Sequence, residues 1–222
     1  MKRNITIVII VILALGFGYF LFRISPEQGT GVPGAGSLEL GEIQAVNEPR
    51  PLESGDHVLG NIDAKNTLIA YEDLQCSACA SFEPILKQVA AELTDTKLVF
   101  RHYPLPSLHK NAVVAAFSAE AAAVQGKFWE YSSALYQKQR DWENLTNPIE
   151  KFAEIAGSVG ISDIERFKNE TENQAYKDKI EADLREALGL NLRGTPSLIF
   201  NGQLLELGSA EQIKAQAETF YK

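Results

Sequence analysis

Residues 67–84 read TLIAYEDLQCSACASFEP, and this stretch decides the fold. Its first five residues form a short apolar run with β-branched side chains, which is typical of a buried strand. A helical pattern follows over about 77–93, where Pro84 should kink the helix or end its first turn. Cys76 and Cys79 therefore lie where a predicted strand ends and a predicted helix begins.

Outward from this stretch, strand and helix signals alternate along the chain. LVFRHY at 98–103 predicts a second strand, which two prolines would end. SLIFN at 197–201 and the run at 203–207 predict two more strands joined by an Asn-Gly turn, and 209–212 matches a capping box that opens a last helix. The helical region between, about 106–192, is too long for one crossover. This order predicts an α/β domain with an inserted helical unit.

Composition narrows the possible functions. The chain has 222 residues, of which 45% are apolar and 23% are charged, and this balance is typical of a folded globular protein. Its net charge of −8 argues against a nucleic-acid partner. Two cysteines, three histidines and one methionine are too few for a zinc ribbon, a haem-attachment signature or a methionine-rich copper site. We therefore expect no bound metal.

The N-terminus predicts a membrane anchor. Residues 5–22 carry no charge and would span about 27 Å as a helix, close to the roughly 30 Å of a bilayer's hydrocarbon core. Two basic residues precede this run and one follows it, which favours a cytoplasmic N-terminus and an exported body. We expect 1–23 to be an uncleaved, single-pass signal anchor in the cell membrane, with cleavage near 34–36 as the alternative.

Residues 24–55 predict a flexible linker. This segment contains four prolines and several glycines, a density that prevents a regular element of useful length. A flexible coil of this size would let the folded body move over roughly 30 Å above the membrane. The body itself is expected at 56–222, on the extracytoplasmic side.

The sequence Cys76-Ser77-Ala78-Cys79 is the constellation that can carry chemistry. At a helix N-terminus, the sulfur of Cys76 faces unpaired backbone N–H groups and the positive end of the helix dipole, and both favour the thiolate. Cysteines three apart on a helix lie on one face with Cβ atoms about 5 to 6 Å apart, so the pair can close and open a disulfide with little backbone movement. An inert structural disulfide and a two-ligand metal clasp are the alternatives, but so short a loop gives a disulfide little entropic benefit.

These residues, together with three further segments, resemble the DsbA family of thiol–disulfide oxidoreductases, and more narrowly its membrane-anchored bacterial branch. The further segments are FRHYPL at 100–105, QGKFWE at 125–130 and GTPS at 194–197, in this order. The resemblance covers about 56–222. It implies an α/β, thioredoxin-like fold with an inserted helical domain at about 106–192, preceded by a single N-terminal transmembrane helix.

By this resemblance, Cys76 is the partly exposed cysteine that forms a mixed disulfide, and Cys79 is the buried resolving cysteine. Pro196 would be the cis-proline beside the pair, and Thr195 would pair with an extended substrate peptide. The implied partners are cysteine-containing exported proteins and a quinone-coupled membrane protein that re-oxidises the pair. No bound cofactor is required, because the cysteine pair carries the redox equivalent.

Between the cysteines, the chain departs from the strongly oxidising members of the family, which have a histidine there. Ser77 and Ala78 take its place, so the helix terminus and the Ser77 hydroxyl remain as candidates to stabilise the thiolate. We therefore expect a less depressed pKa for Cys76 than in histidine-bearing relatives. A less stabilised reduced form means a more negative reduction potential and a weaker oxidant.

On the strand, relatives often carry a buried glutamate six residues before the first cysteine, where this chain has Ala70. Glu72 points to the same face as Ala70, because side chains on a strand alternate with a period of two. Glu72 is a candidate proton acceptor during exchange. The alternative is a solvated glutamate near the end of a strand.

The sequence thus predicts a membrane-tethered, extracytoplasmic enzyme that passes its Cys76–Cys79 disulfide to newly exported proteins. A disulfide reductase or isomerase of the same fold is one alternative, because the direction of electron flow depends on a potential and a partner that the sequence does not contain. A non-catalytic, tethered polypeptide-binding module with a structural disulfide is the other.

Overall fold

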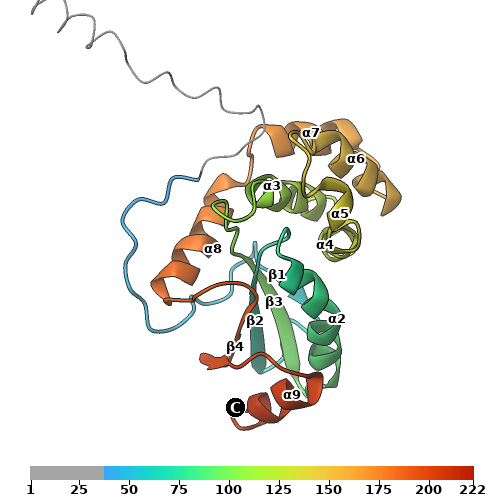
Figure 1. Cartoon of the computed structure of the whole chain (residues 1–222). Helices are drawn as coiled ribbons and strands as arrows, with labels where there is room; N and C mark the ends of the chain where they lie inside the picture. Colours follow the sequence, from blue (N-terminus) through green and yellow to red (C-terminus); the bar gives the residue numbers. More distant parts are fainter. Residues whose placement is uncertain (1–37) are drawn as a thin grey trace, which may run out of the picture. The chain divides into compact units, whose positions relative to one another are not determined.

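The computed structural model describes residues 38–222 (Figure 1). The predicted anchor at 1–23 and the first part of the predicted linker lie outside the described residues. Across 38–222, no helix is both long enough and apolar enough to cross a membrane.

A five-stranded mixed sheet forms the centre of the described chain, in the order β1-β3-β2-β4-β5. The strands β2 and β3 run parallel, and the other neighbouring strands are antiparallel. The four strands predicted from the sequence are confirmed, whereas the edge strand β1 was missed. The strands are β1 (His57–Leu59), β2 (Asn66–Glu72), β3 (Thr96–His102), β4 (Ser197–Phe200) and β5 (Gln203–Leu205).

Helices cover both faces of the sheet, with α2 (Ser77–Glu92) and α9 (Ala210–Glu218) on one face and α8 (Lys177–Gly189) on the other (Figure 1). Neighbouring strand residues contribute to separate cores, because side chains alternate across a strand. Leu68 of β2 packs with α2 and α9, and Ile69 packs with α8. The sheet is therefore buried on both sides.

A helical insert lies between β3 and β4. The sequence predicted it at about 106–192, and its helices occupy 112–189. Its core includes Cys76 and Cys79 together with large insert residues such as Trp142, so the insert and the cysteine pair pack as one unit. The insert contains α3 (Ala112–Ala123), α4 (Phe128–Gln137), α5 (Gln139–Trp142), α6 (Ile149–Ser158), α7 (Ile164–Glu172) and α8.

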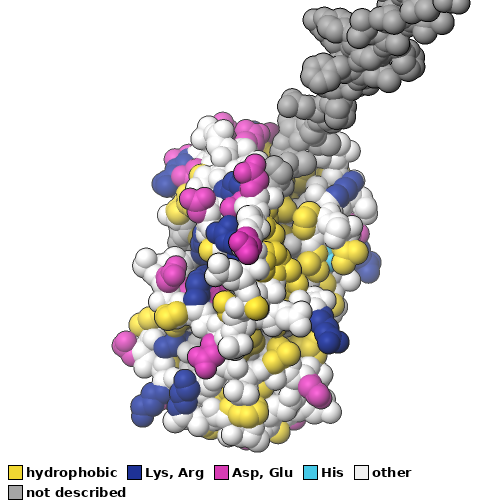
Figure 2. All heavy atoms as spheres, turned by 90° about the vertical axis from the view of Figure 1, so that its left-hand side faces the viewer, with side chains coloured by type: hydrophobic (Ala, Val, Ile, Leu, Met, Phe, Trp, Pro, Cys, Tyr) yellow, Lys and Arg dark blue, Asp and Glu magenta, His cyan; other side chains and the backbone are white. Residues whose placement is uncertain are grey.

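The described part of the predicted linker, residues 38–55, contains no helix or strand but lies along α8, and we call it the N-terminal strap. Figure 2 faces this side of the molecule, where hydrophobic, basic and acidic side chains are interspersed. The backbone N–H of Val46 donates to the carbonyl of Gly189 at 2.9 Å. Glycine suits this contact, because a Cβ there would lie 2.6 Å from the carbonyl oxygen of Gln44. Flexibility predicted over 24–55 therefore does not describe the strap, because proline and glycine content carries no information on tertiary contacts.

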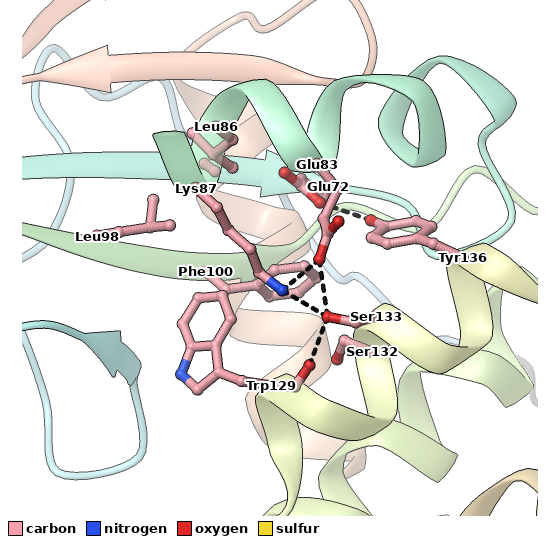
Figure 3. A pocket seen from close by; sticks show the side chains of 11 residues that line it. Glu72, Glu83, Leu86, Lys87, Leu98, Phe100, Trp129, Ser132, Ser133 and Tyr136 are labelled. Atoms are coloured by element: carbon pink, nitrogen blue, oxygen red, sulfur yellow. Dashed lines mark hydrogen bonds and ion pairs between the residues drawn. The ribbon is translucent and has the colours of Figure 1, made fainter. Parts of the chain in front are cut away.

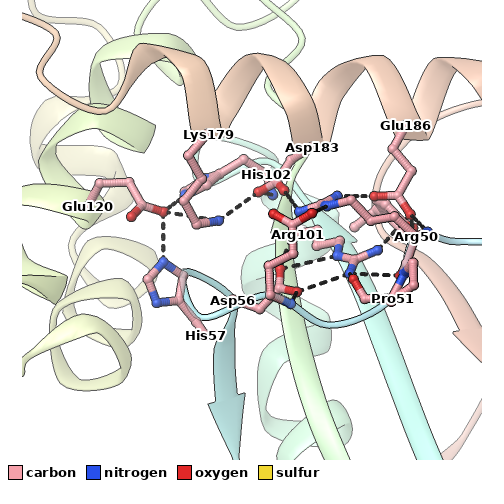
Figure 4. A network of polar contacts seen from close by, with 12 residues as sticks. Arg50, Pro51, Asp56, His57, Arg101, His102, Glu120, Lys179, Asp183 and Glu186 are labelled. Atoms are coloured by element: carbon pink, nitrogen blue, oxygen red, sulfur yellow. Dashed lines mark hydrogen bonds and ion pairs between the residues drawn. The ribbon is translucent and has the colours of Figure 1, made fainter.

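A buried ionic network joins the strap, β3 and α8 (Figure 4). Arg101 of β3 is fully buried and donates to Asp56 at 3.0 Å and to Glu186 at 2.6 Å. Arg50 of the strap pairs with the same Glu186 and with Asp183, the latter at 2.5 Å. Such a network fixes the strap in place, because the loss of one partner would leave a buried charge uncompensated.

Candidate active site

The cysteine pair lies where β2 gives way to α2. The strand ends at Glu72, residues 73–75 form a turn, and Cys76 caps α2 in an extended conformation with φ −75° and ψ 121°. The backbone N–H of Cys76 donates to the carbonyl of Asp73 at 3.0 Å, which closes the turn. Pro84 lies inside α2 without ending it, because the apolar face of the helix continues to pack on the sheet beyond that residue.

The two thiols differ in exposure. Cys76 keeps 8% of its surface exposed and Cys79 keeps none, and both are free thiols. Ser77 and Ala78, between them, are exposed. Cys76 is the more exposed of the two cysteines, as the resemblance implied. It is nevertheless buried, whereas the resemblance implied a partly exposed cysteine.

Hydrogen bonding separates the two thiols further. Hydrogen bonds from the Cys79 thiol, from the Thr195 side chain and from the backbone N–H groups of Cys79 and Ala78 lower the pKa of Cys76 to about 5, against the opposing effect of burial. Burial, with that hydrogen bond and the nearby Glu72 carboxyl, raises the pKa of Cys79 well above its usual range. At neutral pH, the pair therefore holds a thiolate on Cys76 and a proton on Cys79. The contribution expected of the Ser77 hydroxyl stays a prediction.

The loop before β4 approaches the first cysteine. The Thr195–Pro196 peptide bond is cis, and the carbonyl oxygen of Thr195 lies 3.5 Å from the sulfur of Cys76. A groove runs beside this loop, and Leu204 and Leu207 on its wall are largely exposed. The structure thus brings the predicted substrate-binding residues, Thr195 and Pro196, next to the predicted attacking sulfur.

Glu72 is buried behind the cysteines, with 1% of its surface exposed. One carboxylate oxygen accepts a hydrogen bond from the Tyr136 hydroxyl at 2.5 Å, and the other has no partner among the described residues. Burial raises the pKa of Glu72 to about 7 despite that hydrogen bond. The alternative of a solvated glutamate is therefore wrong, because α2 and α4 cover the end of β2.

A cavity extends from Glu72 toward the surface between α2 and α4 (Figure 3). Glu83 and Lys87 of α2 form an ion pair at 2.5 Å, while Ser133 of α4 accepts from Lys87 at 2.6 Å and donates to Glu83 at 2.7 Å. Both charged side chains are partly exposed and so connect the cavity to solvent. This pair was not predicted from the sequence, although Cys79, Glu83 and Lys87 recur every four residues along one helix face.

A second polar cluster lies at the joint between the sheet and α3. One oxygen of Glu120 is 2.7 Å from a ring nitrogen of His57 and 2.8 Å from one of His102, and among the described residues these three side chains have the spacing of metal ligands. The Lys179 ammonium lies 3.5 Å from the same oxygen and already supplies positive charge there (Figure 4). We therefore interpret the cluster as a set of structural hydrogen bonds that link the sheet to α3. The cysteines are not part of it.

A mixed sheet with its parallel pair at the centre, a CxxC at the start of the following helix and a cis-proline beside it define a thioredoxin fold, here with a helical insert. The chain belongs to the thioredoxin family, because the family model described as thioredoxin matches residues 53–218. This match confirms the α/β, thioredoxin-like fold predicted from the sequence.

Solved structures with the same fold include DsbA-like proteins, as the resemblance implied. BdbD from Bacillus subtilis, in its oxidised form, is 24% identical with a TM-score of 0.69, over 79% of this chain and 97% of that one. MdbA, a thiol-disulfide oxidoreductase from Corynebacterium diphtheriae, is 20% identical with a TM-score of 0.60, over 81% and 96%. DsbA2 from Pseudomonas aeruginosa is 21% identical with a TM-score of 0.59, over 77% and 96%. The fold is therefore of the DsbA type.

Curated relatives with similar sequences carry a different name. A Na(+)/H(+) antiporter NhaA 1 of Mycolicibacterium vanbaalenii is 34% identical over 198 residues, which is 86% of this chain and 29% of that protein. The namesake of Mycolicibacterium gilvum is 33% identical over 199 residues, with the same shares. This chain thus spans less than a third of the length of these relatives, and the antiporter name describes those whole proteins.

Proposed function

We propose that this chain is a membrane-tethered, extracytoplasmic thiol–disulfide oxidoreductase that introduces disulfide bonds into exported proteins. The observation that carries the proposal is a Cys76 thiol with a pKa of about 5 next to a buried, protonated Cys79, beside the cis Thr195–Pro196 bond. A thiol that ionises below neutral pH is a good leaving group, so a disulfide that contains it is readily donated.

The proposed reaction starts from the Cys76–Cys79 disulfide. A substrate thiolate attacks the sulfur of Cys76, which forms a mixed disulfide and releases Cys79 as a thiolate that takes up a proton. A second thiolate of the substrate then attacks the substrate sulfur in the mixed disulfide and releases Cys76 as a thiolate. Two electrons pass from the substrate to the cysteine pair, and the substrate gains one disulfide bond.

We assign Glu72 the exchange of a proton with Cys79. The Glu72 carboxyl lies close enough to Cys79 to raise the pKa of that thiol, and its own pKa of about 7 suits both donation and acceptance near neutral pH. The Glu83–Lys87 pair lies at the outer end of the cavity and is partly exposed, so protons can be exchanged with solvent there.

Substrate binding is assigned to the loop before β4. An extended substrate segment would pair with the backbone of Thr195, next to Cys76. The exposed Leu204 and Leu207 would then contact apolar side chains of that segment in the neighbouring groove. This geometry supports unfolded or extended polypeptides as substrates, in agreement with newly exported proteins.

The location and the redox partner rest on the sequence. The uncharged run at 5–22 supports a membrane anchor, and the resemblance to the DsbA family supports re-oxidation by a quinone-coupled membrane protein. A bound cofactor is not needed for the exchange, because the two sulfurs carry the electrons. A reductase or isomerase would use the same site with electrons flowing the other way.

The test uses the full chain, oxidised and in detergent, mixed with a reduced and unfolded test protein. We expect it to accelerate disulfide formation and Cys76→Ala to abolish the acceleration. An equal rate with Cys76→Ala would instead identify a polypeptide-binding module, and the catalytic proposal would be wrong. The reduction potential sets the direction of electron flow, and we expect it to be more negative than in relatives with a histidine between the cysteines.

A further inference from the structure

The turn that presents Cys76 is fastened to the helical insert through its first residue. The carboxylate of Asp73 is buried, and one of its oxygens accepts from the backbone N–H of Leu105 at 2.9 Å and lies 2.8 Å from the ring Nδ1 of His109. Its other oxygen accepts from the backbone N–H of Gln75 at 2.7 Å. Asp73 thus holds the turn to the segment that leads from β3 into α3.

The second and third residues of the turn are fastened as well. The carbonyl of Leu74 accepts from the side-chain amide of Gln139 at 3.2 Å. Gln75 accepts from the backbone N–H of Asn111 at 2.6 Å and donates to the carbonyl of Glu143 at 2.8 Å. Every residue between the end of β2 and Cys76 therefore has a hydrogen bond to the insert.

The insert partners of Gln75 are themselves tied together. The side-chain amide of Asn111, just before α3, donates to the carbonyls of Trp142 at 3.1 Å and Leu145 at 2.9 Å. Gln75 thus inserts its amide between the start of α3 and the end of α5. A neutral amide whose partners are main-chain groups contributes geometry without adding a charge near the cysteines.

The turn in its own right contacts both cysteines. The carbonyl of Asp73 accepts from the N–H of Cys76 at 3.0 Å. The backbone of Asp73 also acts on Cys79, because it lowers the pKa of that thiol against the larger effect of burial. The extended conformation of Cys76 at the helix cap decides whether its sulfur faces the N–H groups of Ala78 and Cys79. A shift of the turn would therefore move the sulfur away from those donors.

We propose that Gln75 is a positioning residue through which the helical insert holds Cys76 in its reactive geometry, with Gln139 in a supporting role. This inference deepens the proposed function and rests on it for its biological meaning. By this proposal the insert affects the reactivity of the Cys76 thiol indirectly. Its hydrogen bonds hold the turn at 73–75 and contact neither sulfur.

The experiment measures the rate at which iodoacetamide alkylates Cys76 in the reduced full chain as a function of pH. Gln75→Met keeps the length of the side chain and removes both hydrogen bonds. We expect the midpoint of the profile to rise, so that alkylation at pH 6 slows by roughly three- to tenfold. Gln139→Met, which loses one bond, should shift it in the same direction by a smaller factor.

Gln88→Met is the matched control, because Gln88 lies on α2 but is exposed and bonds only to Glu92 among the described residues, at 2.9 Å. It should leave the profile unchanged. A lower melting temperature with an unchanged alkylation profile in Gln75→Met would overturn the inference, because Gln75 would then be merely structural. If Gln75→Met does not fold, an unchanged profile in Gln139→Met overturns it instead.

The alkylation assay needs no substrate protein, so the two proposals fail separately. A chain that alkylates with a low midpoint but forms no disulfides in the test protein would refute the proposed function alone. A chain that forms disulfides, and whose profile ignores both glutamine substitutions, would refute the positioning role of Gln75 alone.

Discussion

Replacing Glu72 with glutamine should make the stability of the protein much less dependent on pH. The wild-type carboxyl is buried behind the cysteines, with one oxygen bonded to Tyr136 and the other without a partner among the described residues. A glutamine amide has the same shape and can keep the Tyr136 contact through its oxygen. It cannot ionise, so the substitution removes the buried charge and little else.

The magnitude follows from the pKa. Burial raises the pKa of Glu72 to about 7 from an ordinary 4.5, so the folded state binds a proton that the unfolded state releases between these two values. A carboxyl with a raised pKa contributes stability that is full below pH 4.5 and is lost as the pH rises through 7. A shift of about 2.5 units corresponds to about 3 kcal/mol.

The assay is urea unfolding of the reduced wild type and Glu72→Gln at pH 4.5 and pH 8. The difference in unfolding free energy, variant minus wild type, should increase by about 3 kcal/mol between the two pH values. Glu92→Gln, which replaces an exposed carboxyl at the end of α2, should show no such change. A constant difference for Glu72→Gln would refute the reasoning, because Glu72 would then titrate like an exposed glutamate.

Three further predictions test the site and its supports. Cys79→Ala removes the thiol that donates to Cys76 and should raise the pKa of Cys76 from about 5 by about one unit or more, as thiolate absorbance would record. Arg101→Met removes one of the two arginines that pair with the buried Asp56 and Glu186 and should lower the free energy of unfolding, measured in urea, by about 3 to 5 kcal/mol; an unchanged value would show that the network is dispensable. Gly189→Ala should displace the strap, since its Cβ would lie 2.6 Å from the carbonyl of Gln44, and limited proteolysis should then cut the strap faster than in wild type.

The sequence was sufficient to predict secondary structure where the local pattern and the tertiary packing favour the same conformation. The apolar run at 67–71 is buried at almost every position, so its composition alone indicates a central strand. Ser209 and Gln212 form the capping box that their spacing predicts. Cys76 lies at the start of α2, where the strand and helix patterns of the sequence meet. That position alone was enough to predict a stabilised thiolate.

Other features depend on tertiary contacts that no local pattern contains. Arg101 interrupts an apolar strand in sequence, and its burial makes sense only with Asp56 and Glu186 brought in from the strap boundary and from α8. Glu72 was open to two interpretations, because the helix that covers it, α4, is more than fifty residues away in the chain. The strap was predicted to be flexible for the same reason.

The lowered pKa of Cys76 has a cause that differs from the one a charged neighbour would supply. Ser77 and Ala78 are exposed, and the donors to the sulfur are the Cys79 thiol, the Thr195 side chain and main-chain N–H groups. Main-chain donors act only in the correct backbone geometry, whereas a charge acts over a longer distance and tolerates small movements. A chain without a histidine between its cysteines therefore depends more on the turn at 73–75, which is the segment that the helical insert holds at every residue.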